Sequence, residues 1–214
     1  MTELMRRRRA LMAMKSSSGG HGLPSEYQEV EWIQSDGNQR IAITDDQSIT
    51  DINKFIFEAD VSVHETNSST AIFMCLGSTA GLWLGVVSSG TKIGVGSSAY
   101  FSVDISERHT YKLDSSRSEN TSYATCDGVS EIPRAKTNIA SKRLTLFAAL
   151  DISNWTYYSK VRMYSAKAWF NGALIRELYP CYRKSDNVIG MYDIVNDVFY
   201  TNSGSGTFTK GGNV

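Results

Sequence analysis

The sequence predicts an all-β protein, a two-sheet antiparallel jelly-roll sandwich, preceded by a short N-terminal segment that is helical or disordered. Three observations predict this fold. The 214 residues include 11 Tyr, 8 Phe and 4 Trp but only 3 Pro, a composition that suits strands. Short apolar or alternating runs recur between turn residues at the spacing typical of sandwiches. No long helical period appears between residues 23 and 208.

The clearest strand is residues 54–63, in which every second residue is apolar, so that one face is expected to be buried. Residues 71–76 and 81–87 are more uniformly apolar, as strands buried on both faces would be. In chain order the expected strands lie around residues 30–33, 39–43, 54–63, 71–76, 81–87, 92–96, 99–103, 110–114, 122–126 and 143–150, and within 161–208. In all, we expect about twelve to fourteen strands. The predicted core contains Phe55, Phe57, Val61, Ile72, Leu84, Leu144, Leu146 and Phe147.

Residues 161–208 form the most informative segment. Asn171-Gly172 supplies the two positive-φ positions of a type I′ hairpin turn, and Asp127-Gly128, earlier in the chain, is a second hairpin-turn signal. Residues 188–192 and 198–201 are expected to pair as a closing hairpin. Pro180 lacks an N–H group and should therefore lie at an edge, a bulge or a strand end. Residues 183–187 form a polar loop, which either satisfies its own backbone or faces a ligand.

The first fifteen residues differ from the rest, because they contain good helix formers and neither Gly nor Pro. A helix this short is marginal in water, so it would need a partner, and a disordered tail is the alternative. Residues 16–22 are predicted to be a flexible linker, and residues 23–214 the jelly roll. The residues expected to anchor the chain are Leu4, Met5, Arg6, Arg7, Arg8, Arg9, Leu11 and Met12.

Composition excludes several classes of function. Lys and Arg (22) balance Asp and Glu (22), so no global charge attracts nucleic acid or a membrane surface. No apolar run approaches the length of a membrane span or of a signal-peptide core. Cys75, Cys126 and Cys181 are odd in number and form no CxxC pair, which argues against disulfides and zinc. We expect free thiols and assembly in a reducing cytoplasm.

Three segments resemble a known family. The opening residues 23–33 (LPSEYQEVEWI), the turn and strand at 35–43, and residues 161–202 are similar to laminin-G-like, concanavalin-A-like jelly rolls of bacteriophage and prophage tail or appendage proteins. The resemblance implies a non-enzymatic virion protein, assembled in the host cytoplasm, that forms homo-oligomers and contacts other virion proteins through its N-terminal segment. It also implies adhesion to a host-surface glycan as a function to test.

The same fold houses glycoside hydrolases and lyases, which are the alternative. Retaining members carry three alternating acids on one strand. Here Glu58 and Asp60 supply two, but Ser62 stands at the third position. Because Phe57 and Val61 point inward, Glu58 and Asp60 are expected to lie on a solvated face. We therefore expect no catalytic residue.

No cofactor is expected. His21, His64 and His109 are scattered without metal-ligand spacing and are expected at the surface. The resemblance implies that calcium can bind at a sandwich rim, but no spacing defines such a site. The carboxylates available there are Asp45, Asp46, Asp51 and Asp151.

Aromatic residues remain as candidates for ligand binding. An apolar ring face beside hydroxyl partners suits a sugar, although the same residues can pack in the core or at a subunit interface. Trp32 and Trp169 lie in alternating strands and are expected in the core. The candidate ligand-binding residues are Trp83, Asp151, Asn154, Trp155, Tyr157 and Tyr158.

Overall fold

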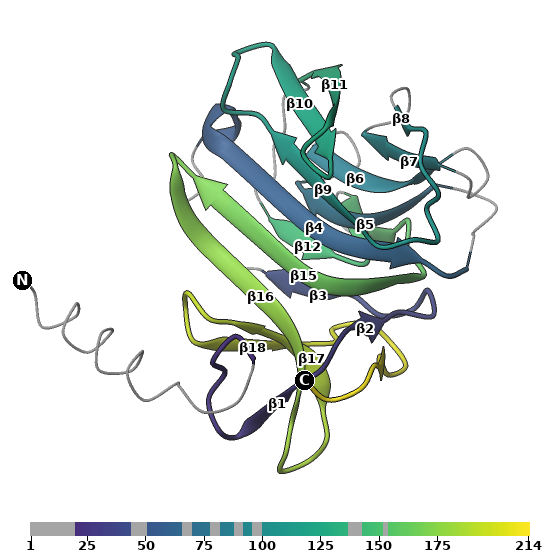
Figure 1. Ribbon diagram of the computed structural model, residues 1–214, viewed down its shortest axis with the longest axis vertical. Helices are drawn as coiled ribbons and strands as arrows, with labels where there is room; N and C mark the ends of the chain where they lie inside the picture. The colour runs from purple at the N-terminus through teal and green to yellow at the C-terminus, as the bar shows by residue number, and fades with distance from the viewer. Residues whose placement is uncertain are drawn as a thin grey trace, which may run out of the picture.

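The computed structural model describes residues 20–43, 51–65, 70–77, 82–87, 92–95, 100–136, 143–151 and 154–214. These residues form two antiparallel sheets packed face to face, which confirms the predicted sandwich. Figure 1 shows β4, β15 and β16 running side by side, with β5, β6 and β12 in the layer behind them. The predicted N-terminal anchor, and residues 16–19 of the predicted linker, lie outside the described residues.

The larger sheet is built around two long central strands. In spatial order its main path is β11 (Ser130–Ala135), β10 (Thr121–Cys126), β9 (His109–Asp114), β4 (Phe55–Val63), β15 (Val161–Phe170), β16 (Ala173–Arg183), β17 (Ile189–Asp193) and β18 (Val198–Thr201). Three short strands join this path: β1 (Tyr27–Glu29) pairs with β16, β2 (Ile33–Gln34) pairs with β15, and β19 (Thr209–Lys210) pairs with β2. A 3-10 turn, η1 (Ile52–Lys54), leads into β4.

The smaller sheet forms the second layer. Its strand order is β3 (Ile41–Ile43), β12 (Leu144–Leu146), β5 (Ala71–Leu76), β6 (Leu82–Val87), β7 (Lys92–Val95) and β8 (Tyr100–Phe101). A separate hairpin is formed by β13 (Ala149–Asp151) and β14 (Asn154–Thr156). The described residues thus contain 19 strands. This exceeds the expected number because several strands have only two or three residues, too few to show a period.

The core lies between the two sheets. All eight predicted core residues are buried, and Phe55, Phe57, Leu84 and Leu146 are fully inaccessible. Ile72 is the one predicted core residue that lies outside the main core cluster. It belongs to a second buried cluster, whose members are Ile72, Cys75, Trp83, Val87 and Ala149. The smaller sheet is therefore buried on both faces, as its uniformly apolar strands predicted.

Local turn chemistry is as predicted. Asn171 and Gly172 have φ of 51° and 77° between β15 and β16, and Asp127 and Gly128 have φ of 51° and 71° between β10 and β11. Both pairs supply the left-handed conformations that two-residue hairpin turns need.

Pro180 differs in detail from its prediction. It lies inside β16, opposite Met191 of β17, rather than at a strand end. On the other side of β16, the pairing with β15 ends at Leu178 and the pairing with β1 begins at Cys181. Pro180 therefore lies where β16 changes partner, which is the place in a long strand where a missing N–H costs least.

Candidate functional site

The solvent-facing side of the larger sheet is centred on β15. Val161 and Met163 point into the core before a bulge at residues 163–165, and Ala166 and Ala168 point inward after it. The extra residue shifts the alternation by one position, so the outward residues lie on both sides of the bulge. They are the partly exposed Arg162, Tyr164, Lys167 and Trp169.

Trp32 and Trp169 were predicted to be core residues, and this prediction was wrong. Both are partly exposed on the outer side. The Arg162 guanidinium lies over the Trp32 ring at 4.2 Å, and the Lys112 ammonium lies 5.5 Å from the Trp169 ring. Trp169 is two residues from Lys167 in β15, so both side chains lie on the same face of the strand. The lysine was the sequence signal that this face points outward.

A third ring lies between them. The Arg108 guanidinium is 4.1 Å from the centre of the Tyr164 ring. We call the row formed by Trp32, Arg162, Tyr164, Lys167 and Trp169 the β15 strip. From Arg162 to Trp169 it extends for roughly 20 Å along the strand.

The carboxylates beside the β15 strip are paired with cations. Arg108 donates hydrogen bonds of 2.9 Å and 2.6 Å to the two carboxylate oxygens of Asp60. These hydrogen bonds are the main reason that the pKa of Arg108 is raised. Ser62, at the third position of the acid pattern, is buried and lies 2.8 Å from His64 Nε2. Asp60 is therefore the anionic partner of Arg108 in an ion pair on this outer face.

The second candidate region is the hairpin β13–β14. The structure brings Trp83 close to this hairpin, because Trp83 and Ala149 share one buried cluster. Trp83 is only 6% exposed, so its ring presents no face for stacking. Tyr157 is 43% exposed, and the Tyr158 hydroxyl lies 2.5 Å from Arg40 Nη1. The side chains of Asp151, Asn154 and Trp155 lie outside the described parts of the structure.

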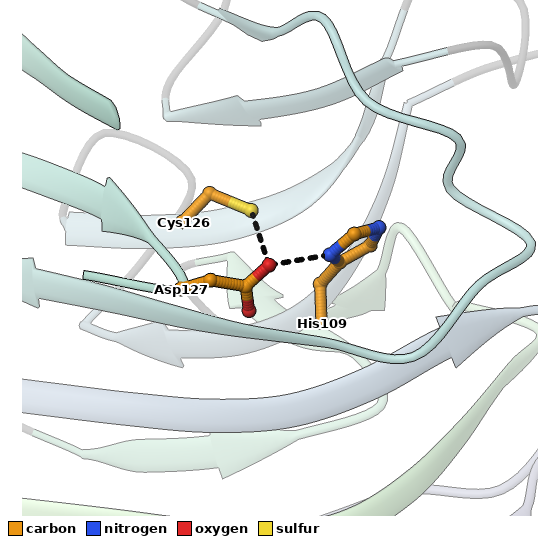
Figure 2. Close-up of side chains that lie close together, drawn as sticks. All are labelled: His109, Cys126 and Asp127. Carbon is orange, nitrogen blue, oxygen red and sulfur yellow. Dashed lines mark hydrogen bonds and ion pairs between the residues drawn. The ribbon is translucent and has the colours of Figure 1, made fainter. Parts of the chain in front are cut away.

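A third site, which sequence reasoning missed, lies at one end of the sandwich. His109 Nδ1 is 2.7 Å from Asp127 Oδ2, and Cys126 Sγ is 3.8 Å from the same oxygen (Figure 2). His109 begins β9, Cys126 ends β10, and Asp127 is the first residue of the β10–β11 turn. No sequence motif contains all three residues. His109 lies beside Cys126 and Asp127 only because β9 pairs with β10.

The electrostatics of this cluster favour a carboxylate beside a protonated thiol. Burial, and after it the neighbouring Asp127 carboxylate, raise the pKa of Cys126 to about 11. Burial also raises the pKa of Asp127, but hydrogen bonds from His109 and the Thr110 backbone N–H outweigh it and lower the pKa overall. Cys126 is therefore a thiol at neutral pH and not an activated nucleophile.

The other histidines differ from one another. His64 is exposed, as predicted. His21 was placed in the flexible linker, but its ring stacks on Tyr179 at 3.6 Å and its Nδ1 lies 2.5 Å from Glu29 Oε1. The predicted linker therefore ends before His21, since this residue is held against β1 and β16.

Of the four carboxylates considered for calcium, the described residues include the side chain of Asp51 only. Asp51 accepts a 2.9 Å hydrogen bond from the backbone N–H of Asn53, within its own turn. Asp45 and Asp46, and the side chain of Asp151, lie outside the described residues. Within the described part of the chain, no helix is long and apolar enough to cross a membrane.

No protein-family model matches the sequence, and no curated protein matches it. Among solved structures, the chain is similar to domain 4 of AbnA, a GH43 extracellular arabinanase from Geobacillus stearothermophilus, in complex with arabinotriose. That similarity has 12% identity over 52% of this chain and 60% of that chain, with a TM-score of 0.32. The chain is also similar to the full extracellular region of zebrafish Gpr126/Adgrg6, at 14% identity over 87% of this chain and 26% of that chain, with a TM-score of 0.43. The chain thus spans 60% and 26% of the lengths of these two structures. The fold assignment rests on the chain's own strand order and burial.

Proposed function

We propose that this protein is a non-enzymatic binding module of a virion and that the β15 strip binds a glycan on the host surface. The observation that carries the proposal is the strip itself. Three partly exposed aromatic rings and two cations line one outward row on the larger sheet, whereas ten other aromatic residues are buried.

The chemistry of the β15 strip suits a polyhydroxylated ligand. Trp and Tyr rings offer apolar faces that pack against the C–H groups of a sugar ring. Arg162 and Lys167 are donors for sugar hydroxyl groups, and Glu177, whose Oε1 lies 3.1 Å from Lys167 Nζ, is an acceptor for them. The elongated shape favours a chain of sugars over a single one.

The proposed place in a virion is supported by the three segments that resemble phage jelly rolls. The opening segment and the C-terminal segment are neighbours in the fold, because β1 pairs with β16 and β2 pairs with β15. The quoted residues thus form one continuous substructure. The anchoring role proposed for the first fifteen residues, through virion partners and homo-oligomers, belongs to the same proposal.

The absence of catalysis is also part of the proposal. The acid pattern on β4 ends in a buried serine, and Asp60 is held by a bidentate arginine. Glu58 lies between two lysines, opposite Lys112 on β9 and opposite Lys167 on β15. Both neighbouring strands therefore place a lysine, and not a second carboxylate, directly opposite Glu58.

The test is a glycan-binding measurement. Wild-type protein is screened on immobilised bacterial polysaccharides, and hits are measured by calorimetry for Trp169→Ala and Trp32→Ala. We expect each variant to weaken binding by about 1–3 kcal/mol per lost ring, the range measured for stacking on aromatic side chains. Tyr157→Ala is the matched control, because Tyr157 is exposed on the β13–β14 side. Loss with Tyr157→Ala alone would move the site to that hairpin. Release of reducing ends would favour the enzymatic alternative.

A further inference from the structure

His109 places both of its ring nitrogens against hydrogen-bond acceptors. Nε2 lies 3.1 Å from the backbone carbonyl oxygen of Asp104, and Nδ1 lies 2.7 Å from Asp127 Oδ2. A carbonyl oxygen accepts only, so Nε2 carries the proton. Nδ1 then faces a carboxylate oxygen, so either a second ring proton, as in an imidazolium–carboxylate pair, or a metal ion lies between the two atoms.

The donor atoms around that position are those of a transition-metal site. His109 Nδ1, Cys126 Sγ and one Asp127 oxygen all lie within 4.8 Å of one another. Imidazole, thiolate and carboxylate are the ligands that zinc takes in proteins, and three protein ligands with an open fourth position are typical of its accessible sites. Calcium, in contrast, prefers a shell of oxygens.

Two of the three ligands are held by a second contact. The Asp104 carbonyl fixes the His109 ring, and the backbone N–H of Thr110 donates a 2.9 Å hydrogen bond to Asp127 Oδ1, which leaves Oδ2 toward the cluster. A backbone carbonyl on the far nitrogen of a histidine and a hydrogen bond on the free carboxylate oxygen are the usual supports of metal ligands.

An independent observation comes from Tyr111. Its side chain is 1% exposed, and its hydroxyl is a hydrogen-bonding neighbour of the Cys126 thiol. The Tyr111 backbone lies directly opposite Cys126, and the Tyr111 ring meets the His109 ring edge-on at 6.0 Å. A thiolate at Cys126 would be a stronger acceptor for this buried hydroxyl than the thiol is.

We propose that His109 Nδ1, Cys126 Sγ and the Asp127 carboxylate bind one Zn²⁺ ion. Binding forms the Zn–S bond as Cys126 releases its thiol proton to solvent. The fourth position faces solvent, because the side chains of Asp127 and His109 are 46% and 18% exposed. Donor atoms around tetrahedral zinc lie roughly 3.3–3.8 Å apart, so the 2.7 Å separation of Nδ1 and Oδ2 must widen by about 0.6 Å, whereas the 3.8 Å separation of Sγ and Oδ2 already fits.

The site is independent of the proposed glycan surface. His109 and Cys126 lie on the core-facing side of the larger sheet, whereas the β15 strip lies on its solvent-facing side. Bound zinc would join the start of β9 to the end of β10 and to the turn after it. A failure of zinc binding therefore leaves the glycan proposal untouched, and the converse also holds.

The test uses the full chain, reduced and stripped with a chelator that is then removed. Calorimetry with Zn²⁺ should give one equivalent, and Co²⁺ should give the visible spectrum of a tetrahedral site with a thiolate-to-cobalt band. Cys126→Ser should abolish the band, and His109→Gln and Asp127→Asn should each lower Zn²⁺ affinity by at least tenfold. Tyr111→Phe keeps the ring and removes the hydroxyl, and should lower affinity by roughly 10–100-fold.

Two variants serve as controls and should bind as wild type. Cys181→Ser removes another buried thiol, and Asp186→Asn removes an exposed carboxylate that binds Arg183. Circular dichroism verifies the fold of each variant. Should Cys126→Ser not fold, Asp127→Asn decides, because asparagine tolerates the positive φ at this turn. The proposal is overturned if the wild type binds no Zn²⁺, if Ca²⁺ binds in preference, or if the cobalt band survives in folded Cys126→Ser or binding is unchanged in Asp127→Asn.

Discussion

Glu58 on β4 lies directly opposite Lys167 on β15 in the antiparallel register. Lys167 in turn lies 3.1 Å from Glu177 on β16, and on the other side of β4, Glu58 lies opposite Lys112 on β9. Charges of alternating sign therefore cross four strands on the outer face of the larger sheet. Directly opposed charges of this kind stabilise strand pairing and fix its register.

The first prediction concerns these carboxylates. Glu58→Gln and Asp60→Asn should each cost roughly 0.2–1 kcal/mol in the free energy of unfolding, because the pairs are partly exposed to water. Neither substitution should remove any catalytic activity. Denaturant unfolding and a reducing-end assay on bacterial polysaccharides check both statements. An activity that either substitution abolishes would contradict the proposed function.

The core should respond more strongly. Phe57 is fully buried and lies 5.9 Å from Phe55, ring centre to ring centre. Phe57→Ala should cost about 3–5 kcal/mol, since the lost apolar contacts leave a cavity between the sheets. Urea unfolding measures the cost. Val129→Ala, at an 84% exposed position, is the control and should stay close to wild type.

Gly190 lies on β17, against the next strand. A Cβ atom there would lie 2.2 Å from the backbone carbonyl oxygen of Tyr200 and 2.9 Å from the Phe199 ring. Because backbone cannot move aside easily, Gly190→Ala should destabilise the protein by about 1–3 kcal/mol. Gly212→Ala meets its nearest atom at 3.6 Å and should be tolerated in the same thermal-unfolding measurement.

His64 predicts a dependence of stability on pH. Burial and the nearby Arg162 lower the pKa of His64 in the folded protein below its ordinary value of 6.5. As pH falls through the unfolded value, the unfolded chain takes up the proton first, so this histidine reduces stability on acidification. His64→Gln should therefore lose less thermal stability than wild type between about pH 7.5 and pH 5.5. An identical loss in both proteins would contradict the assignment.

Deletion of residues 1–18 tests the anchor. The described sandwich starts at Gly20, and His21 is its first packed side chain. The deleted protein should therefore keep its β-rich circular dichroism spectrum and its unfolding midpoint. It should no longer incorporate into particles, because the apolar and basic segment is proposed to bind virion proteins. Unchanged stoichiometry in particles would place the anchor in the sandwich.

Much of the fold follows from local sequence. The alternation in residues 55–63 identifies a strand with one buried face, and Asn171-Gly172 and Asp127-Gly128 form the hairpin turns that their conformational preferences predict. These features depend on neighbours in the chain, so the sequence alone determines them.

The functional surfaces depend on tertiary structure. A single extra residue in β15, at the bulge after Met163, reverses the alternation and sets Trp169 outward with Lys167. Trp83 was predicted to bind a ligand, but its ring is buried, because Ala149 and its neighbours pack over this face of the smaller sheet. His109, Cys126 and Asp127 meet only through the register of β9 with β10, in which Tyr111 lies opposite Cys126. The sequence by itself determined the longer alternating strands and the two-residue turns, but not the shortest strands. Only strand register and layer packing decided which side chains face solvent and which meet, because a shift of one residue exchanges the two faces of a strand.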